Sequence, residues 1–275
     1  MRKLRTFGFL AGAALTVLLF ASALAAPFVA PHDPSAQDSS RRLEGPSREH
    51  LFGLDDLGRD VFSRVVWGAR VSLRVGLSVV VVSSLTGVLL GALAGYFGGA
   101  IETIVMRVCD TLLAFPGILL AIALVAMLGP NLDNVIIALS IIGWVGYARL
   151  TRGQVLKIRQ MDYVVAAQAL GARSARVIAR HVLPNVINPV IVMATLGLAG
   201  AILAEASLSF LGLGVQPPTP SWGAMLTAGR RYIGHADHLA IFPGLAIMLA
   251  VMGLNFLGDG LIDALDPKYR REVKE

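Results

Sequence analysis

The stretch that decides the fold class is VSLRVGLSVVVVSSLTGVLLGALAGYF, residues 71–97. Arg74, close to its start, is its one charged residue. A helix needs about 20 consecutive, predominantly apolar residues to cross the hydrocarbon core of a bilayer. The stretch is therefore long enough and apolar enough to form a transmembrane helix.

Apolar runs of the same kind lie on both sides of this stretch. Together with it they number six, at residues 7–26, 71–97, 101–128, 134–148, 185–211 and 239–261. The sequence therefore predicts an all-α polytopic membrane protein with six transmembrane helices. We divide it into an N-terminal transmembrane helix at 1–30, an extracytoplasmic polar segment at 31–70, a transmembrane core at 71–263 and a cytoplasmic tail at 264–275.

The composition supports this fold class. Hydrophobic residues make up 55% of the 275 residues and charged residues 15%, and the mean hydropathy is +0.69. A soluble domain usually carries about 25% charged residues, and a disordered chain is poor in apolar residues, so both of these classes are disfavoured. Cys109 is the single cysteine, which excludes a disulfide within the chain.

The first apolar run follows three basic residues, Arg2, Lys3 and Arg5. It shares features with a signal peptide, but the apolar region of a signal peptide has only about 7–15 residues. We therefore expect an uncleaved first span, with the basic flank on the cytoplasmic side.

The positive charges indicate which side of the membrane each loop faces. With a cytoplasmic N-terminus, the 24 Lys and Arg residues divide into 15 on the inner side and 9 on the outer side. Inner loops are enriched in Lys and Arg, so the pattern favours a multi-pass membrane protein with both termini in the cytoplasm. The net charge of +6 then reflects orientation in the lipid bilayer, and nucleic acid is not an expected partner.

The motifs of common catalytic sites are missing. We find no G-x-x-x-x-G-K-[ST], no H-E-x-x-H and no G-x-S-x-G, so we expect no catalytic residues and no cofactor bound by this chain. His235 and His238 have a spacing that suits one helical turn, but a third ligand is lacking. We therefore predict no metal site.

Glycines form a stripe on the helix expected at 71–97. Gly87, Gly91 and Gly95 are four residues apart and share one face. Small residues let neighbouring helix backbones approach closely in lipid. Two readings stay open: a helix that slides or rocks against its partner, and static close packing.

Two of the apolar runs contain features that interrupt them. In the third run, Arg107 and Asp110 can pair at i,i+3, and Pro116 should kink the helix. In the fifth run, Glu205 should face the bundle interior or a watery cavity, because a charge in the hydrocarbon core is costly. Glu205 and Pro116 are candidates for a translocation path, and the alternative for Glu205 is a buried hydrogen bond between helices.

The polar segment 149–184 contains the most specific pattern, DYVVAAQALGARSARVIARHVLP at 162–184. Asp162 can cap a short helix, on which Tyr163, Ala166, Ala167 and Leu170 share one face. Gly171 can adopt the left-handed conformation that ends this helix.

A second short helix should follow in the same segment. It would carry Arg173, Arg176 and Arg180 along one side, where they reach anionic headgroups or solvent, and Pro184 suits the first turn of the next span. The segment thus presents a short exposed helix, fixed at both ends, that suits docking into a groove of a partner protein.

This pattern resembles the coupling loop of binding-protein-dependent ABC importer permeases. The resemblance rests on Ala166-Ala167, Gly171 and Leu183-Pro184. Val165 and His181 differ from the family pattern, which has an acidic residue and usually an isoleucine there.

Further blocks are similar to the dipeptide/oligopeptide/nickel class of these permeases. They are DLGRD at 56–60 with GARVSL at 68–73, SFLGLGVQPP at 209–218 with SWG at 221–223, and LGDGL at 257–261 with DALDP at 263–267. The resemblance covers about residues 50–270 and is to the C-type subunit.

The resemblance implies the type I ABC importer permease fold, a location in the inner membrane of the cell and a set of partners. The chain would line a translocation path with a related B-type permease. Two ABC ATPase subunits would bind ATP and Mg, and an extracytoplasmic substrate-binding protein would deliver the substrate. The ATPase-coupling residues would be Asp162, Tyr163, Ala166, Ala167, Leu170, Gly171, Leu183 and Pro184.

The substrate and two other functional classes stay open. Dipeptides or oligopeptides are expected, and nickel chelates or glutathione are the alternatives within the same class. A secondary transporter would need coupling-ion or filter residues in the membrane, where the spans offer little beyond Glu205. A membrane enzyme would need clustered His, Asp or Glu residues at one depth, and the sequence does not suggest such a cluster.

Overall fold

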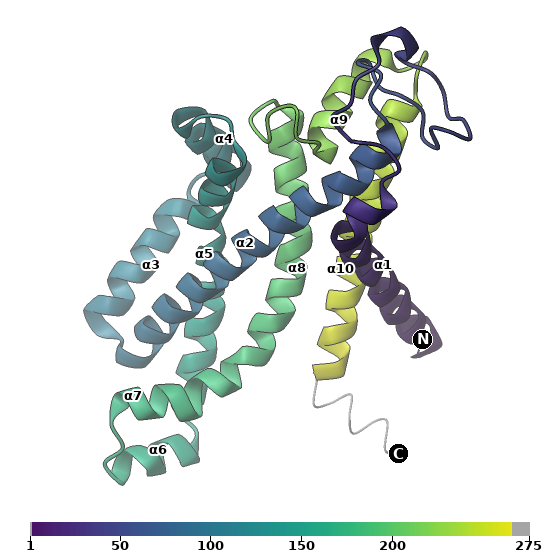
Figure 1. The fold of residues 1–275 in the computed structure, drawn as a ribbon. Helices are drawn as coiled ribbons and strands as arrows, with labels where there is room; N and C mark the ends of the chain where they lie inside the picture. Colours follow the sequence, from purple (N-terminus) through teal and green to yellow (C-terminus); the bar gives the residue numbers. More distant parts are fainter. Residues whose placement is uncertain (1, 266–275) are drawn as a thin grey trace.

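The computed structural model describes residues 2–265, which form helices and no β-strand (Figure 1). Leu54 and Asp60 make one isolated antiparallel bridge. The predicted tail at 264–275 lies outside the described residues except for its first two positions. The α-helices are α1 (Arg2–Val29), α2 (Val61–Phe97), α3 (Gly99–Leu113), α4 (Gly117–Leu128), α5 (Leu132–Ile158), α6 (Asp162–Ala169), α7 (Ser174–Val177), α8 (Leu183–Phe210), α9 (Trp222–Gly229) and α10 (His238–Leu265).

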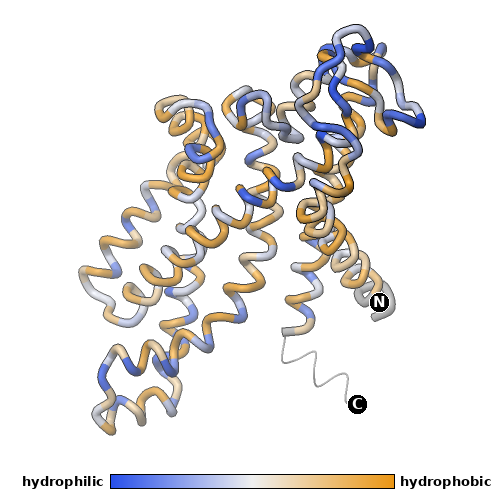
Figure 2. The backbone as a smooth tube through the Cα atoms, viewed as in Figure 1, coloured by the Kyte–Doolittle hydropathy of each residue, from blue (hydrophilic) through white to orange (hydrophobic). Residues whose placement is uncertain are grey.

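The six predicted spans are confirmed, although one of them is broken. Five stretches of helix are long and apolar enough to cross a membrane, and the pair α3 and α4 makes a sixth that bends by 88°. The break falls at residues 114–116, so Pro116 marks a sharper change of direction than the expected kink. Figure 2 shows apolar residues along the long helices, and polar residues gathered mainly towards the two ends of the molecule.

Helix α2 begins ten residues before the apolar stretch at 71–97. Asp60 caps it, because its carboxylate accepts a hydrogen bond from the Ser63 N–H at 2.7 Å. Residues 61–70 therefore belong to this helix rather than to the polar segment assigned to 31–70. Helix α5 likewise continues to Ile158, past the predicted end of its span at residue 148.

The glycine stripe of α2 lies directly against α5. A Cβ atom placed on Gly87 would come within 2.5 Å of the Tyr147 Cβ, and one on Gly95 within 2.9 Å of the Val155 Cβ. Gly91 faces the carbonyl of Ala148 in the same way. The two backbones thus approach as closely as glycine allows, which is the geometry that sliding and static packing both require.

Ion pairs fasten α3 to α5. Glu102 pairs with Arg152, and Asp110 pairs with Arg149. The expected pairing of Asp110 with Arg107 on the same helix is therefore wrong, because the neighbouring helix supplies a guanidinium that reaches the carboxylate. Cys109 is fully buried at this contact, where it packs as a small core residue.

The molecule has two ends of different character. The start of α1, the end of α10 and the helices α6 and α7 lie towards the lower end in Figure 1, and residues 31–60 and α9 lie at the upper end. Helix α9 falls within the glycine- and proline-rich stretch 212–237 and is held to α2 by a 2.8 Å hydrogen bond from Trp222 Nε1 to the Val65 carbonyl.

Candidate functional site

The short helix predicted in the polar segment is α6, which we call the docking helix together with Leu170 and Gly171. Its N-cap is Met161, in an extended conformation, and no side chain makes a capping hydrogen bond. The prediction that Asp162 is the cap is therefore wrong by one residue. Asp162 is the first residue inside the helix, where its negative charge still favours the positive end of the helix dipole.

Gly171 ends the docking helix in the left-handed conformation, as predicted. Its φ is +81°, and its N–H donates to the Gln168 carbonyl at 2.9 Å. A Cβ atom at this position would have no heavy atom within 4 Å. Glycine is therefore required here by backbone conformation and not by lack of space.

One face of the docking helix is anchored to the rest of the chain. Val164 is fully buried in a cluster with Val155, Val177 and Val182. Gln168 Nε2 donates a hydrogen bond to the Tyr96 hydroxyl at 3.2 Å, which ties the helix to α2. The position of the docking helix is thus coupled to the C-terminal half of α2.

The opposite face of the docking helix is exposed and largely apolar. Leu170 is 89% exposed and Tyr163 is 44% exposed. Ala166 is also exposed, and Ala167 is half-buried. Burying one leucine side chain is worth about 1.5–3 kcal/mol, so this face offers free energy to any partner that covers it.

The docking helix is followed by α7, which a π-helical turn, Ile178–Val182, joins to α8. Leu183 donates its N–H to the Ile178 carbonyl, five residues back, and Pro184 lies in the first turn of α8, as predicted. A proline ring clashes with the carbonyl four residues before it, and the wider π turn relieves this contact. The sequence analysis did not predict the π turn.

Glu205 lies inside the contact between α2 and α8. It is fully buried, and its carboxylate accepts hydrogen bonds from Ser209 Oγ at 2.7 Å and Ser72 Oγ at 3.4 Å. Of the two roles left open for Glu205, this geometry corresponds to a buried hydrogen bond between helices.

A cavity of about 520 Å³ lies among α2, α4, α5 and α8. Its lining is mainly apolar, and Ser83 and Tyr147 are its polar members. Gly117, directly after Pro116, lines it, whereas Glu205 does not. The break at Pro116 thus places the start of α4 on the cavity wall.

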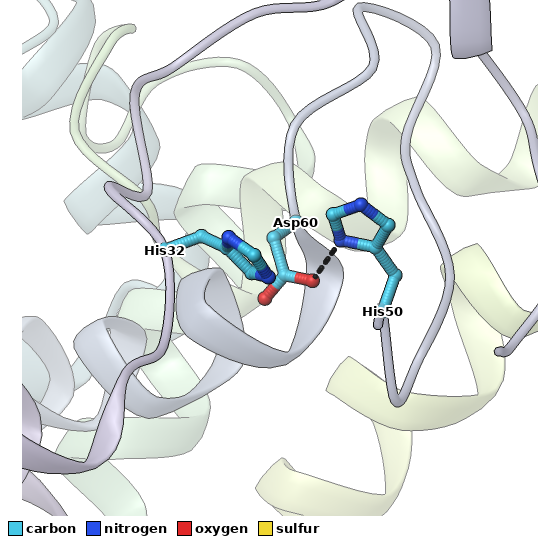
Figure 3. A group of neighbouring side chains, drawn as sticks. All are labelled: His32, His50 and Asp60. Carbon is cyan, nitrogen blue, oxygen red and sulfur yellow. Dashed lines mark hydrogen bonds and ion pairs between the residues drawn. The ribbon is translucent and has the colours of Figure 1, made fainter. Parts of the chain in front are cut away.

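Sequence reasoning missed one group of side chains. His32, His50 and Asp60 converge, as Figure 3 shows, with ligand atoms that all lie within 4.8 Å of one another. His235 and His238, whose spacing suits one helical turn, do not belong to this group. His238 lies beside the Leu54 carbonyl, and His235 is exposed. Separations of 18 and 10 residues between the three members match no common ligand spacing, so no local signal could have found them.

Comparison with known families finds a match for two parts of the chain. Residues 87–271 match the family described as binding-protein-dependent transport system inner membrane component. Residues 7–46 match the N-terminal TM domain of oligopeptide transport permease C. The first match includes the docking helix, the cavity-lining helices α4, α5 and α8, and the end of α2 from residue 87.

Individual relatives are similar over nearly the whole chain. The dipeptide transport system permease protein DppC of Alkalihalophilus pseudofirmus is 48% identical over 248 residues, which cover 90% of this chain and 82% of that protein. The di/tripeptide permease DppC of Pseudomonas aeruginosa is 48% identical over 96% of this chain and 89% of its own length. The glutathione permease GsiD of Pectobacterium atrosepticum is 46% identical, with coverages of 98% and 90%.

These matches agree with the helix bundle, its apolar spans and the anchored docking helix. The chain is therefore a multi-pass membrane permease and belongs to the family of inner membrane components of binding-protein-dependent transport systems, as a member of its C type.

Proposed function

We propose that this chain is one of two permease subunits of an ATP-driven importer of short peptides. The observation that carries the proposal is the docking helix, which is fixed to the bundle by Val164 and Gln168 while Leu170 is left 89% exposed. An anchored helix with a free apolar face suits insertion into a groove of a partner. The partner expected at this face is an ABC ATPase subunit.

The coupling path runs from the docking helix into the membrane. Val164 packs with residues of α5 and α8, and Gln168 contacts Tyr96 near the end of α2. Movement of the docking helix on ATP binding would therefore reach three spans at once. ATP and Mg belong to the ATPase subunits in this proposal, because this chain has no recognisable nucleotide-binding motif.

The cavity among α2, α4, α5 and α8 is this chain's candidate contribution to the translocation path. Its apolar lining suits side chains of a peptide, and Ser83 and Tyr147 offer polar contacts. A related B-type permease would supply the other half of the path, and an extracytoplasmic binding protein would select the substrate. Both termini would lie in the cytoplasm with the docking helix.

Short peptides are favoured as substrates by the names of the relatives. Two of the similar permeases are named for dipeptides or di- and tripeptides, and one for glutathione, which is itself a tripeptide. Glutathione is therefore the second candidate. The genes beside the one for this chain should encode a binding protein, a second permease and one or two ATPases.

The substitution Leu170→Asp tests the docking face. Because Leu170 contributes little to the chain's own core, the variant should fold and insert normally. Loss of about 1.5–3 kcal/mol of apolar burial corresponds to about tenfold or more in affinity, so recovery of ATPase subunits with the purified permease should fall by at least that factor. Peptide uptake into proteoliposomes should fall with it.

A matched control lies at the other end of the molecule. Ile233 is also an exposed apolar residue, at 66%, and Ile233→Asp should leave ATPase recovery unchanged. Normal ATPase recovery and peptide uptake by a well-inserted Leu170→Asp variant would contradict the proposal. Uptake driven by a proton gradient without ATPase subunits would favour a secondary transporter instead.

A further inference from the structure

We propose that His32, His50 and Asp60 form a binding site for a divalent transition-metal ion of the zinc type. The three side chains come from separate parts of the upper end of the molecule: the segment after α1, the loop near residue 50 and the N-cap of α2. His50 and Asp60 are buried, and His32 is half-buried. Figure 3 shows the two imidazole rings and the carboxylate gathered together.

The spacing of the three groups is close to that of a metal site. Zinc binds His nitrogen at about 2.0–2.1 Å and carboxylate oxygen at about 2.0–2.2 Å, so the ligand atoms of a tetrahedral site lie roughly 3.3 Å apart. His50 Nδ1 and Asp60 Oδ1 are already 2.9 Å apart. The widest separation in the group is at most 4.8 Å, and a side-chain rotation of half-buried His32 would close the difference.

The donor set selects the class of ion. Two imidazoles and one carboxylate suit zinc and its neighbours in the first transition row, whereas calcium and magnesium prefer sites built from oxygen alone. Three protein ligands leave a fourth position for water or for a further donor. A cavity of about 600 Å³ lined by His32, Pro31 and Trp67 provides space beside the site for that position.

Groups around the site hold two of the ligands in place. Asp60 Oδ2 accepts the Ser63 N–H at 2.7 Å, which leaves Oδ1 directed at His50. His50 Nε2 lies 3.9 Å from a carboxylate oxygen of exposed Glu49, which is longer than a hydrogen bond, so a small movement of Glu49 would be needed for contact. A carboxylate beside the second nitrogen of a ligating histidine orients the ring and raises its basicity.

His32 is not needed for the bond between His50 and Asp60, yet its ring centroid lies 4.6 Å from that of His50. A 3.1 Å hydrogen bond between His32 Nε2 and the Glu49 carbonyl holds the ring there. A bound cation would use both rings and would join the segment after α1 to the start of α2. This inference is independent of the peptide substrate and of the docking helix.

The experiment uses the detergent-solubilised protein purified without a polyhistidine tag. After treatment with a chelator, the protein is titrated with Zn²⁺ against a chromophoric competitor. The wild type should bind one Zn²⁺ that the variant His32→Ala/His50→Ala does not bind. His32→Ala alone should weaken binding by at least the factor of about 10–100 seen when an outer-shell partner is removed.

Two further variants separate the metal site from folding and from other histidines. Asp60→Asn keeps a good helix cap but removes the anionic ligand, so it should also weaken binding. His235→Ala removes an exposed histidine at the same end and should bind Zn²⁺ as the wild type does. Added Zn²⁺ should raise the Tm of the wild type and of His235→Ala, and not that of His32→Ala.

Three outcomes would overturn the inference. They are equal Zn²⁺ binding by the wild type and the double variant, unchanged affinity in His32→Ala, and loss of binding in His235→Ala. If the double variant or Asp60→Asn fails to fold, His32→Ala still decides, because its side chain contributes neither to the bond between His50 and Asp60 nor to the cap of α2.

Discussion

At the upper end of the molecule, the charged groups around the start of α2 are paired within the chain. Asp55 accepts a hydrogen bond from Arg59 Nε at 2.7 Å, and Arg64 donates to the Pro34 carbonyl at 2.8 Å. At the lower end, the docking helix leaves Leu170 almost fully exposed and is held by one buried valine, Val164, and by the hydrogen bond from Gln168 to α2. The charged groups at the upper end thus have partners within the chain, whereas the apolar surface at the lower end is left for a partner protein to cover. Changes at the upper end should therefore act on stability, and changes at the lower end on partner binding and transport.

The largest effect is expected for Asp55→Ala. Asp55 is buried together with Arg59 and Arg64, and its carboxylate is 2.7 Å from Arg59 Nε and 3.5 Å from Arg64 Nε. Removing one partner of a buried ion pair costs about 3–5 kcal/mol, because the remaining charge stays buried without compensation. We expect a large fall in Tm of the purified protein and little folded permease in the membrane.

Asp56→Ala is the control for this prediction. Its side chain is more exposed and lies 3.8 Å from Arg59 Nη2, and exposed pairs contribute about 0–1 kcal/mol. Equal Tm values for the two variants would show that the buried network does not stabilise the upper end.

The next effect concerns the lower end and the variant Gly171→Val. A left-handed conformation costs an L-residue about 1–2 kcal/mol, and valine is among the least tolerant residues because it is β-branched. Since no neighbouring atom is in the way, this cost should displace the docking helix without damaging the bundle. We expect normal insertion, a Tm close to that of the wild type and strongly reduced peptide uptake.

Gly171→Asn is the matched variant, because asparagine enters the left-handed region more readily than other non-glycine residues. It should restore most of the uptake. Wild-type uptake by a well-expressed Gly171→Val permease would remove the docking helix from the coupling mechanism.

The sequence was sufficient for features that depend on local chemistry. The six apolar runs predicted the spans, and Gly171 predicted the end of the docking helix, because both follow from hydropathy or backbone conformation over a few residues. The start of α2 at Val61 was within reach as well, since aspartate is a preferred N-cap residue and Asp60 stands directly before the helix. The apolar run begins only at Val71, because Arg64 and Arg70 lie in the first turns of this helix.

Contacts between distant residues were not predictable in this way. Asp110 is paired with Arg149, 39 positions away, although Arg107 stands three positions before it. The choice between them depends on how α3 packs against α5, which no local pattern encodes. The convergence of His32, His50 and Asp60 and the hydrogen bond from Ser72 to Glu205, 133 positions away, have the same origin.

The smallest effect on stability and uptake is expected for Asp162→Ala, and a comparison of Asp162 with Asp60, at the starts of two helices, shows why. Asp60 accepts a hydrogen bond from Ser63 N–H and caps α2, whereas Asp162 lies inside α6 and makes no capping bond. Loss of a charge from the first turn of a helix costs about 0.3–1 kcal/mol, so Asp162→Ala should lower the Tm by only a degree or two and reduce uptake slightly. A side chain that capped the docking helix would cost about 1 kcal/mol or more and would loosen the helix on which coupling depends. A loss of uptake as severe as that in Gly171→Val, measured at equal amounts of inserted protein, would mean that Asp162 contacts the ATPase directly rather than serving the helix dipole.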